Sequence, residues 1–120
     1  MPKAKQLRYG FIITSTSASV KDPGQVLRVA LAKKKEGAPV GIFLIGDGVY
    51  IATSKPDGDD ATDTLLKAIG AGATVNISKD HLDATGLSVD RLPKGTIITE
   101  KPYRELVAKV MEEWDRVVVC

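Results

Sequence analysis

The sequence is poor in the residues that most often bind metals or form covalent cross-links. Its 120 residues include one cysteine, Cys120, and one histidine, His81. A single cysteine excludes a disulfide within the chain, and one copy of each residue excludes a cysteine-rich zinc site and a multi-histidine metal site. We therefore expect no metal and no cofactor, and we expect a reduced, cytoplasmic protein.

Long apolar runs and a strong charge of one sign are also missing. No stretch approaches the roughly 20 apolar residues that span a bilayer. We also expect no signal peptide, because residues 1–5 are not followed by the apolar core that one requires. The formal net charge is +2, from 17 lysines and arginines against 15 aspartates and glutamates. This balance is too small to indicate a nucleic-acid partner by itself, so we expect neither a membrane nor a nucleic acid as partner.

What is present is the pattern of a globular α/β protein. The composition, 43% hydrophobic and 27% charged, is typical of one globular domain, to which we assign residues 1–120. Short apolar runs, which alternate with helical stretches, are predicted as strands: Tyr9–Thr14, Val40–Ile45, Ala73–Ile77, Thr96–Thr99 and Arg116–Val119. Continuous apolar runs indicate strands buried on both faces. We predict a single-domain, three-layer α/β sandwich of about five mostly parallel strands, with helices on both faces.

Capping and periodicity predict the helices. Pro23 suits a first helical position, and this helix should run to about Glu36. Ser78 is predicted to cap a short helix that ends near Gly86, and the last helix begins near Pro102. The last helix carries an apolar stripe that we expect to lie in the core or at a subunit interface. The stripe comprises Tyr103, Leu106, Val107, Val110, Met111 and Trp114.

Ligands of parallel sheets bind at the carboxyl ends of the strands. This rule selects the loops after Thr14, Ile45 and Ile77. Small polar side chains and open backbone N–H groups in those loops favour an anionic or polar ligand. The candidate ligand-binding residues are Thr14, Ser15, Gly46, Asp47, Gly48, Asn76 and His81.

The segment Gly46-Asp47-Gly48 follows a strand, as a dinucleotide fingerprint does. Ile51 stands where the third glycine is required, and we expect the loop to continue without opening a helix, which argues against a Rossmann site. The segment is either a tight turn or a point of close backbone approach to a ligand or a neighbouring subunit. Residues 49–51 are apolar and lie outside a strand, so we expect an exposed patch and a homo-oligomer.

Two candidate nucleophiles remain. Ser78 and His81 are three residues apart and share a helix face, which permits a serine-hydrolase hypothesis, although a plain N-cap explains Ser78 more simply. Cys120 either supports sulfur or metal chemistry with a partner, or has no function and stands where a cysteine costs the fold little stability. Both residues are kept as catalytic candidates.

The order of elements and several stretches resemble one known family. The stretches are Tyr9 to Ser17, Leu44-Ile45-Gly46-Asp47-Gly48-Val49, the turn from Ile69 to Gly72, and Val75-Asn76-Ile77-Ser78 through Gly86-Leu87. Together with the terminal helix and strand, they resemble the DsrE/DsrF-like family of small sulfur-relay proteins, which includes the YchN-like group. The resemblance is spread over nearly the whole chain.

The resemblance implies a persulfide-carrying cysteine directly after the third strand, with a glycine eight residues later. Gly86 matches the glycine, but Ser78 stands in place of the cysteine. A serine hydroxyl cannot form a persulfide. The resemblance thus implies an accessory or binding subunit, or a protein that uses Cys120 instead. It also implies a homo-oligomer (dimer, trimer or hexamer) and a sulfur-relay protein as a partner.

A function of another class stays open beside this one. The chain could be a non-enzymatic protein that binds an anion or a nucleotide at the carboxyl ends of its strands. A sulfur adduct on Cys120 would favour sulfur relay, whereas a ligand-induced rise in melting temperature would favour binding.

Overall fold

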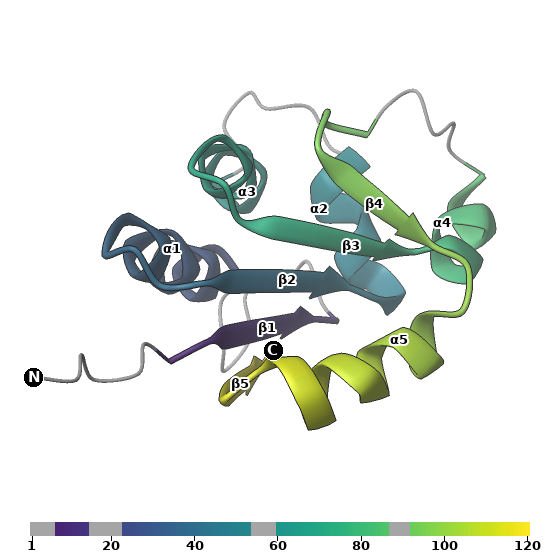
Figure 1. The fold of residues 1–120 in the computed structure, drawn as a ribbon. Coiled ribbons are helices and arrows are strands. Elements are labelled where there is room, and N and C mark those ends of the chain that lie inside the picture. Colours follow the sequence, from purple (N-terminus) through teal and green to yellow (C-terminus); the bar gives the residue numbers. More distant parts are fainter. Residues whose placement is uncertain (1–6, 15–22, 54–59, 87–91) are drawn as a thin grey trace, which may run out of the picture.

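The computed structural model describes residues 7–14, 23–53, 60–86 and 92–120. Within these residues, five strands form one sheet in the order β4-β3-β2-β1-β5, and every neighbouring pair is parallel (Figure 1). The strands are β1 (Tyr9–Ile13), β2 (Val40–Leu44), β3 (Thr74–Ser78), β4 (Thr96–Thr99) and β5 (Arg116–Val119). The predicted α/β fold with a parallel sheet is confirmed, with strand ends within about a residue of the prediction.

Helical segments connect the strands. They are α1 (Pro23–Lys35), the 3₁₀ turn η1 (Gly46–Gly48), α2 (Val49–Thr53), α3 (Asp60–Gly70), α4 (Lys79–Thr85), α5 (Pro102–Ala108) and the π-helical turn η3 (Lys109–Glu113). Helix α1 begins at Pro23, as predicted. None of the helices in the described residues is long and apolar enough to cross a membrane.

One face of the sheet carries the main core. Its side chains alternate along each strand with those of the other face, and they pack against residues of α1, α2 and α3. Fully buried members include Ile13, Leu27, Ile42, Leu65 and Ile77. Burying one such side chain contributes about 1.5–3 kcal/mol, so this face accounts for much of the stability of the fold.

The opposite face is lined by a different set of residues. Cross-strand register aligns Ile12 with Phe43, Phe43 with Asn76, and Asn76 with Ile97. Ile12 and Phe43 are buried, so β1 and β2 are covered on both faces. This double burial is why these strands appear in the sequence as continuous apolar runs.

Two paired glycines make room for Trp114 on that same face. Gly10 of β1 lies opposite Gly41 of β2. A Cβ atom at Gly10 would come within 1.9 Å of the indole, and one at Gly41 within 2.8 Å. The indole therefore packs directly on the backbone of both strands, at a distance that only glycine permits.

The predicted stripe of the last helix is not a core stripe. Tyr103, Val107 and Met111 are 60%, 61% and 78% exposed, and Val110 is 38% exposed. Only Leu106 and Trp114 of the stripe are partly buried. The π-helical turn η3 widens the spiral before Trp114 and so breaks the helical spacing on which the prediction relied. The exposed apolar side chains leave the subunit-interface alternative open.

The expected exposed patch at residues 49–51 is also wrong. These residues form α2, which η1 opens directly, and Val49 and Ile51 are buried in the core, whereas Tyr50 is exposed. A helix of five residues is too short to show a periodic pattern, and its β-branched residues favoured a non-helical interpretation.

Candidate functional site

Ser78 lies where β3 ends and α4 begins. It is the N-cap of α4, and its Oγ accepts a hydrogen bond from the backbone N–H of His81 at 3.4 Å. The residue has no exposed surface. The predicted capping role is confirmed, and in this geometry the hydroxyl satisfies a helix N–H group that would otherwise lack a partner.

His81 faces Tyr103 rather than the Ser78 hydroxyl. Its Nε2 lies 3.4 Å from the Tyr103 hydroxyl, and the two rings meet edge to face with centroids 6.1 Å apart. Its Nδ1 is buried and has no hydrogen-bond partner among the described residues. Asp83, a possible orienting group, is bonded to Lys79 at 2.8 Å instead. This arrangement does not supply the nucleophile, base and orienting group that a serine hydrolase needs.

Asn76 lies on the same face of β3 as Ser78, two residues earlier in the strand. Its Nδ2 donates a hydrogen bond to Thr99 Oγ1 at 3.1 Å, and both residues are more than nine-tenths buried. Both line a cleft of about 420 Å³ beside β4, together with Ile97, Ile98, Glu100, Lys101 and Glu105. Among the predicted ligand-binding residues that the structure describes, Asn76 is the one that lines this cleft.

Thr14 and Cys120 meet at the other edge of the sheet. The backbone N–H and the hydroxyl of Thr14 both donate to the carbonyl of Cys120, each at 2.7 Å, and the N–H of Cys120 donates to Ile12 at 2.9 Å. Cys120 is partly buried and packs against the core cluster. Ser15, the remaining candidate here, lies outside the described residues.

The two catalytic candidates are far apart. Ser78 ends β3 and Cys120 follows β5, and two strands lie between them. Three strand spacings of about 4.8 Å amount to roughly 14 Å. Their side chains also belong to opposite faces, since Ser78 shares a face with Asn76 whereas Cys120 packs against the core face. Cys120 is therefore not a thiol placed at the Ser78 position.

The Gly46-Asp47-Gly48 turn brings η1 close to the end of β1. A Cβ atom at Gly48 would lie 2.1 Å from the Ile13 carbonyl oxygen, and Gly46 has a positive φ of 55°. Asp47 is exposed. The positive φ of Gly46 fits the tight-turn alternative, and Gly48 permits a close approach to a backbone segment of the same chain, which neither alternative had included.

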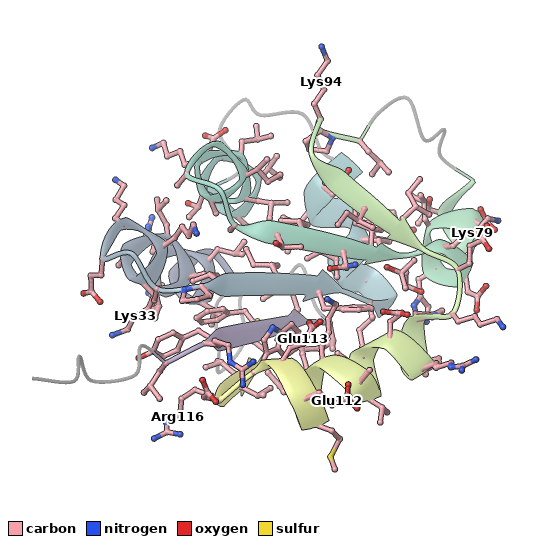
Figure 2. The ribbon with its side chains drawn as sticks, viewed as in Figure 1. Lys33, Lys79, Lys94, Glu112, Glu113 and Arg116 are labelled. Atoms are coloured by element: carbon pink, nitrogen blue, oxygen red, sulfur yellow. The ribbon has the colours of Figure 1, made fainter. Side chains whose placement is uncertain are left out.

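A second cleft lies at the amino-terminal ends of β2 and β3. Its volume is about 410 Å³, and its lining includes Arg8, Lys34, Gly41, Lys109, Glu113 and Trp114. Figure 2 labels Glu113 close to where the last helical turn meets the sheet. The sequence rule that places ligands at carboxyl ends gave no indication of this cleft. The nearest signal is the pair Gly10 and Gly41, whose alignment becomes visible only with the strand register.

Thr99 and Tyr103 were also missed by sequence reasoning. Each contacts a predicted residue across more than 20 positions of sequence, Thr99 through Asn76 and Tyr103 through His81. No local pattern reports such contacts, because they depend on how β4 and α5 are placed against β3 and α4.

Comparisons with known proteins identify relatives of two kinds. The uncharacterized protein MJ0989 from Methanocaldococcus jannaschii is 30% identical over 115 residues, which cover 93% of this chain and 98% of that protein. Bifunctional uridylyltransferase/uridylyl-removing enzymes from two strains of Mycobacterium tuberculosis are 37% identical over 93 residues. That match covers 73% of this chain but only 11% of those enzymes, so the chain spans about a tenth of their length. No protein-family model matches the chain.

Solved structures support the fold. The ychN protein from E. coli superposes with a TM-score of 0.79 at 20% identity and covers 96% of this chain and all of that one. The protein of unknown function MTH1491 from Methanobacterium thermoautotrophicum gives a TM-score of 0.66 at 17% identity, covering 96% of this chain and 100% of that one. The parallel five-stranded sheet is therefore a YchN-like fold, and by sequence the chain belongs to the family of the archaeal protein MJ0989.

Proposed function

We propose that this protein is a DsrE-like, sulfur-relay-type protein that lacks the persulfide cysteine and acts as an accessory or binding subunit. The proposal rests on the position of Ser78, which ends β3 and caps α4 within a YchN-like fold. This is the position at which the family resemblance puts the sulfur-carrying cysteine. The hydroxyl there is buried and caps the helix, and it cannot hold sulfane sulfur.

The alternative use of Cys120 has less support. Cys120 lies about three strand spacings from Ser78 and packs against the core. A relay through Cys120 would need a separate site, built at the edge strand β5. We therefore favour the accessory role, with a sulfur-relay protein as the partner and the reducing cytoplasm as the location.

A homo-oligomer is part of this proposal. The side of α5 and η3 that faces away from the sheet is apolar and exposed at Tyr103, Val107 and Met111, and Val117 and Val119 of β5 add to the exposed apolar surface. Exposed apolar surface of this kind marks interaction sites.

Sedimentation velocity of the wild type should show an oligomer, and Met111→Glu should shift it toward the monomer. Val29→Glu, at a 50% exposed site on α1, is the matched control. A wild type that sediments as a monomer at micromolar concentration would contradict the proposed assembly.

The experiment for the sulfur site restores the missing thiol. A cysteine at position 78 would open α4, where the main-chain N–H groups favour a thiolate. Because Ser78 is buried, we expect inorganic polysulfide to load Ser78→Cys slowly and to give a persulfide at that residue by peptide mass mapping. If the new thiol stays unmodified even after prolonged exposure, position 78 is not a sulfur site.

A second candidate function rests on the cleft beside β4. Its volume of about 420 Å³ lies in the range of small-molecule sites, and the buried Asn76 and Thr99 offer polar groups to an anion or a nucleotide. A rise in melting temperature with phosphate or a nucleotide that disappears in Asn76→Ala would support this function. A rise that is equal in both proteins would place the ligand elsewhere.

A further inference from the structure

The cleft at the amino-terminal end of the sheet is distinct from the site proposed above. It lies where β2 and β3 begin, whereas Ser78 lies at the opposite end of β3. Glycines at two lining positions keep it open. A Cβ atom at Gly72 would come within 3.2 Å of the Lys34 side chain, and one at Gly41 would meet the indole of Trp114. Its volume of about 410 Å³ is sufficient for a small molecule.

Cations dominate the lining. Arg8 is held by Asp115, with Nε 3.2 Å from Oδ2, and Lys109 is held by Glu113 at 3.0 Å. Lys34 has no carboxylate partner among the residues that the structure describes. Three positive charges therefore stand against the two negative charges of Asp115 and Glu113, and Lys34 supplies the excess positive charge.

The fixed pairs also orient the charged groups. Arg8 donates its backbone N–H to Asp115 at 2.8 Å in addition to the side-chain contacts, so Asp115 binds both the backbone and the guanidinium of this residue. The hydrogen bond and the charge of Asp115 together raise the pKa of Arg8 above its usual value, so this cation stays protonated. The Lys109 side chain is only 15% exposed. Both cations are thus held in place before a ligand arrives, which lowers the entropy lost on binding.

Trp114 adds an apolar wall to this basic cleft. Its indole lies on Gly10 and Gly41 and borders the cleft. A rigid aromatic wall beside cations suits a ligand that has a flat apolar part and an anionic group. We propose that the amino-terminal cleft binds a small organic anion, a phosphate or carboxylate with a planar group, with Lys34 contacting the anion and Trp114 contacting the planar group.

The test uses the only tryptophan of the chain as its reporter. Phenyl phosphate, benzoate and inorganic phosphate are titrated while the fluorescence of Trp114 is recorded, and calorimetry detects any binding that leaves fluorescence unchanged. We expect saturable binding of phenyl phosphate, weaker binding of benzoate, and the weakest binding of phosphate, which lacks the planar group. Lys34→Gln should weaken binding of phenyl phosphate about tenfold, the loss expected for one charged hydrogen bond.

Lys35→Gln is the matched control, since Lys35 is the next residue, is exposed and does not line the cleft. It removes the same charge and should leave binding unchanged. The proposal is overturned if neither method detects saturable binding up to about 10 mM, a range that covers even weak affinities. It is also overturned if Lys34→Gln and Lys35→Gln weaken binding equally, because the anion would then respond only to overall charge.

Discussion

Polar side chains are buried at one end of the sheet and border an open cleft at the other. At the carboxyl end of β3, Asn76, Ser78 and Thr99 are buried, and they are bonded to one another or to a helix N–H. At the amino end, Arg8 and Lys109 form ion pairs at the border of an open cleft, next to Trp114. Under the proposed function, Ser78 at the carboxyl end stands where a sulfur-carrying cysteine would be, but its hydroxyl only caps a helix. The amino end has accessible charged groups, although neither the sequence pattern nor the family resemblance predicted a site there.

Loss of the Trp114 indole, which packs on Gly10 and Gly41, should destabilise the protein most. Trp114→Ala should lower the free energy of unfolding by about 3 kcal/mol, the lower end of the range for a buried tryptophan, because Trp114 is partly exposed. Urea denaturation followed by circular dichroism measures the change. Replacing Met111, which is 78% exposed, by alanine is the control and should change stability little in the monomer. If both variants unfold alike, Trp114 does not anchor the last helical segment on the sheet.

The next effect tests whether the polar groups at the carboxyl end are structural. Asn76→Ala leaves the buried Thr99 hydroxyl without its partner and should cost about 1–3 kcal/mol. The double variant Asn76→Leu with Thr99→Val removes both polar groups at similar volume and should cost less than the single change. Urea midpoints of the three proteins decide this. A double variant that costs as much stability as Asn76→Ala, or more, would contradict the structural role of this hydrogen bond.

Ser78→Ala should have a smaller effect, about 1 kcal/mol, because it removes one capping hydrogen bond from α4. Asp80→Ala, at an exposed position in the first turn of the same helix, should stay within about 0.5 kcal/mol of the wild type. Hydrogen exchange of the His81 amide reports the cap directly, and we expect it to become faster in Ser78→Ala. An unchanged exchange rate would contradict the capping role.

The smallest effect is a pH dependence at α4. The hydrogen bond to Asp83, followed by the charge of Asp83, raises the pKa of Lys79 above its usual value. A raised folded-state pKa stabilises the protein below the unfolded-state value, and this contribution is lost as pH rises through the folded-state value. Lys79 extends from α4 into solvent (Figure 2), so Lys79→Gln should be nearly neutral. Any difference from the wild type should vanish in strong alkali, and a difference that grows there would reverse the assigned sign.

Much of the fold could be predicted because its signals are local. Continuous apolar runs marked β1 and β2, and Ser78 followed by a glycine at Gly86 marked the start and end of α4. The helix α2 was missed because Val49 and Ile51 favour strands by propensity, and only tertiary packing makes them helical. Trp114 was assigned to a helical stripe because the π-helical turn before it leaves no sequence signature.

The site was predicted less well because its contacts are not local. Ser78 and Asn76 were selected from their place near the end of a strand; Ser78 lies at the end of β3, whereas Asn76 lies in the middle of it. Their partners depend on register, since Asn76 meets Thr99 only because β4 lies parallel to β3. Cys120 could be placed at a strand end from the sequence, but its separation from Ser78 required the strand order.

The accessory role requires that this protein does not itself carry sulfur, and the state of Cys120 shows whether it does. Wild-type protein is exposed to inorganic polysulfide, persulfides are trapped by alkylation, and the peptide that contains Cys120 is weighed by mass spectrometry. Because Cys120 packs against the core and its backbone is bonded to Thr14 and Ile12, we expect little persulfide in the folded protein and much more after unfolding. A stoichiometric persulfide on the folded wild type, absent from Cys120→Ser, would show that the protein is a sulfur carrier and would contradict the accessory role.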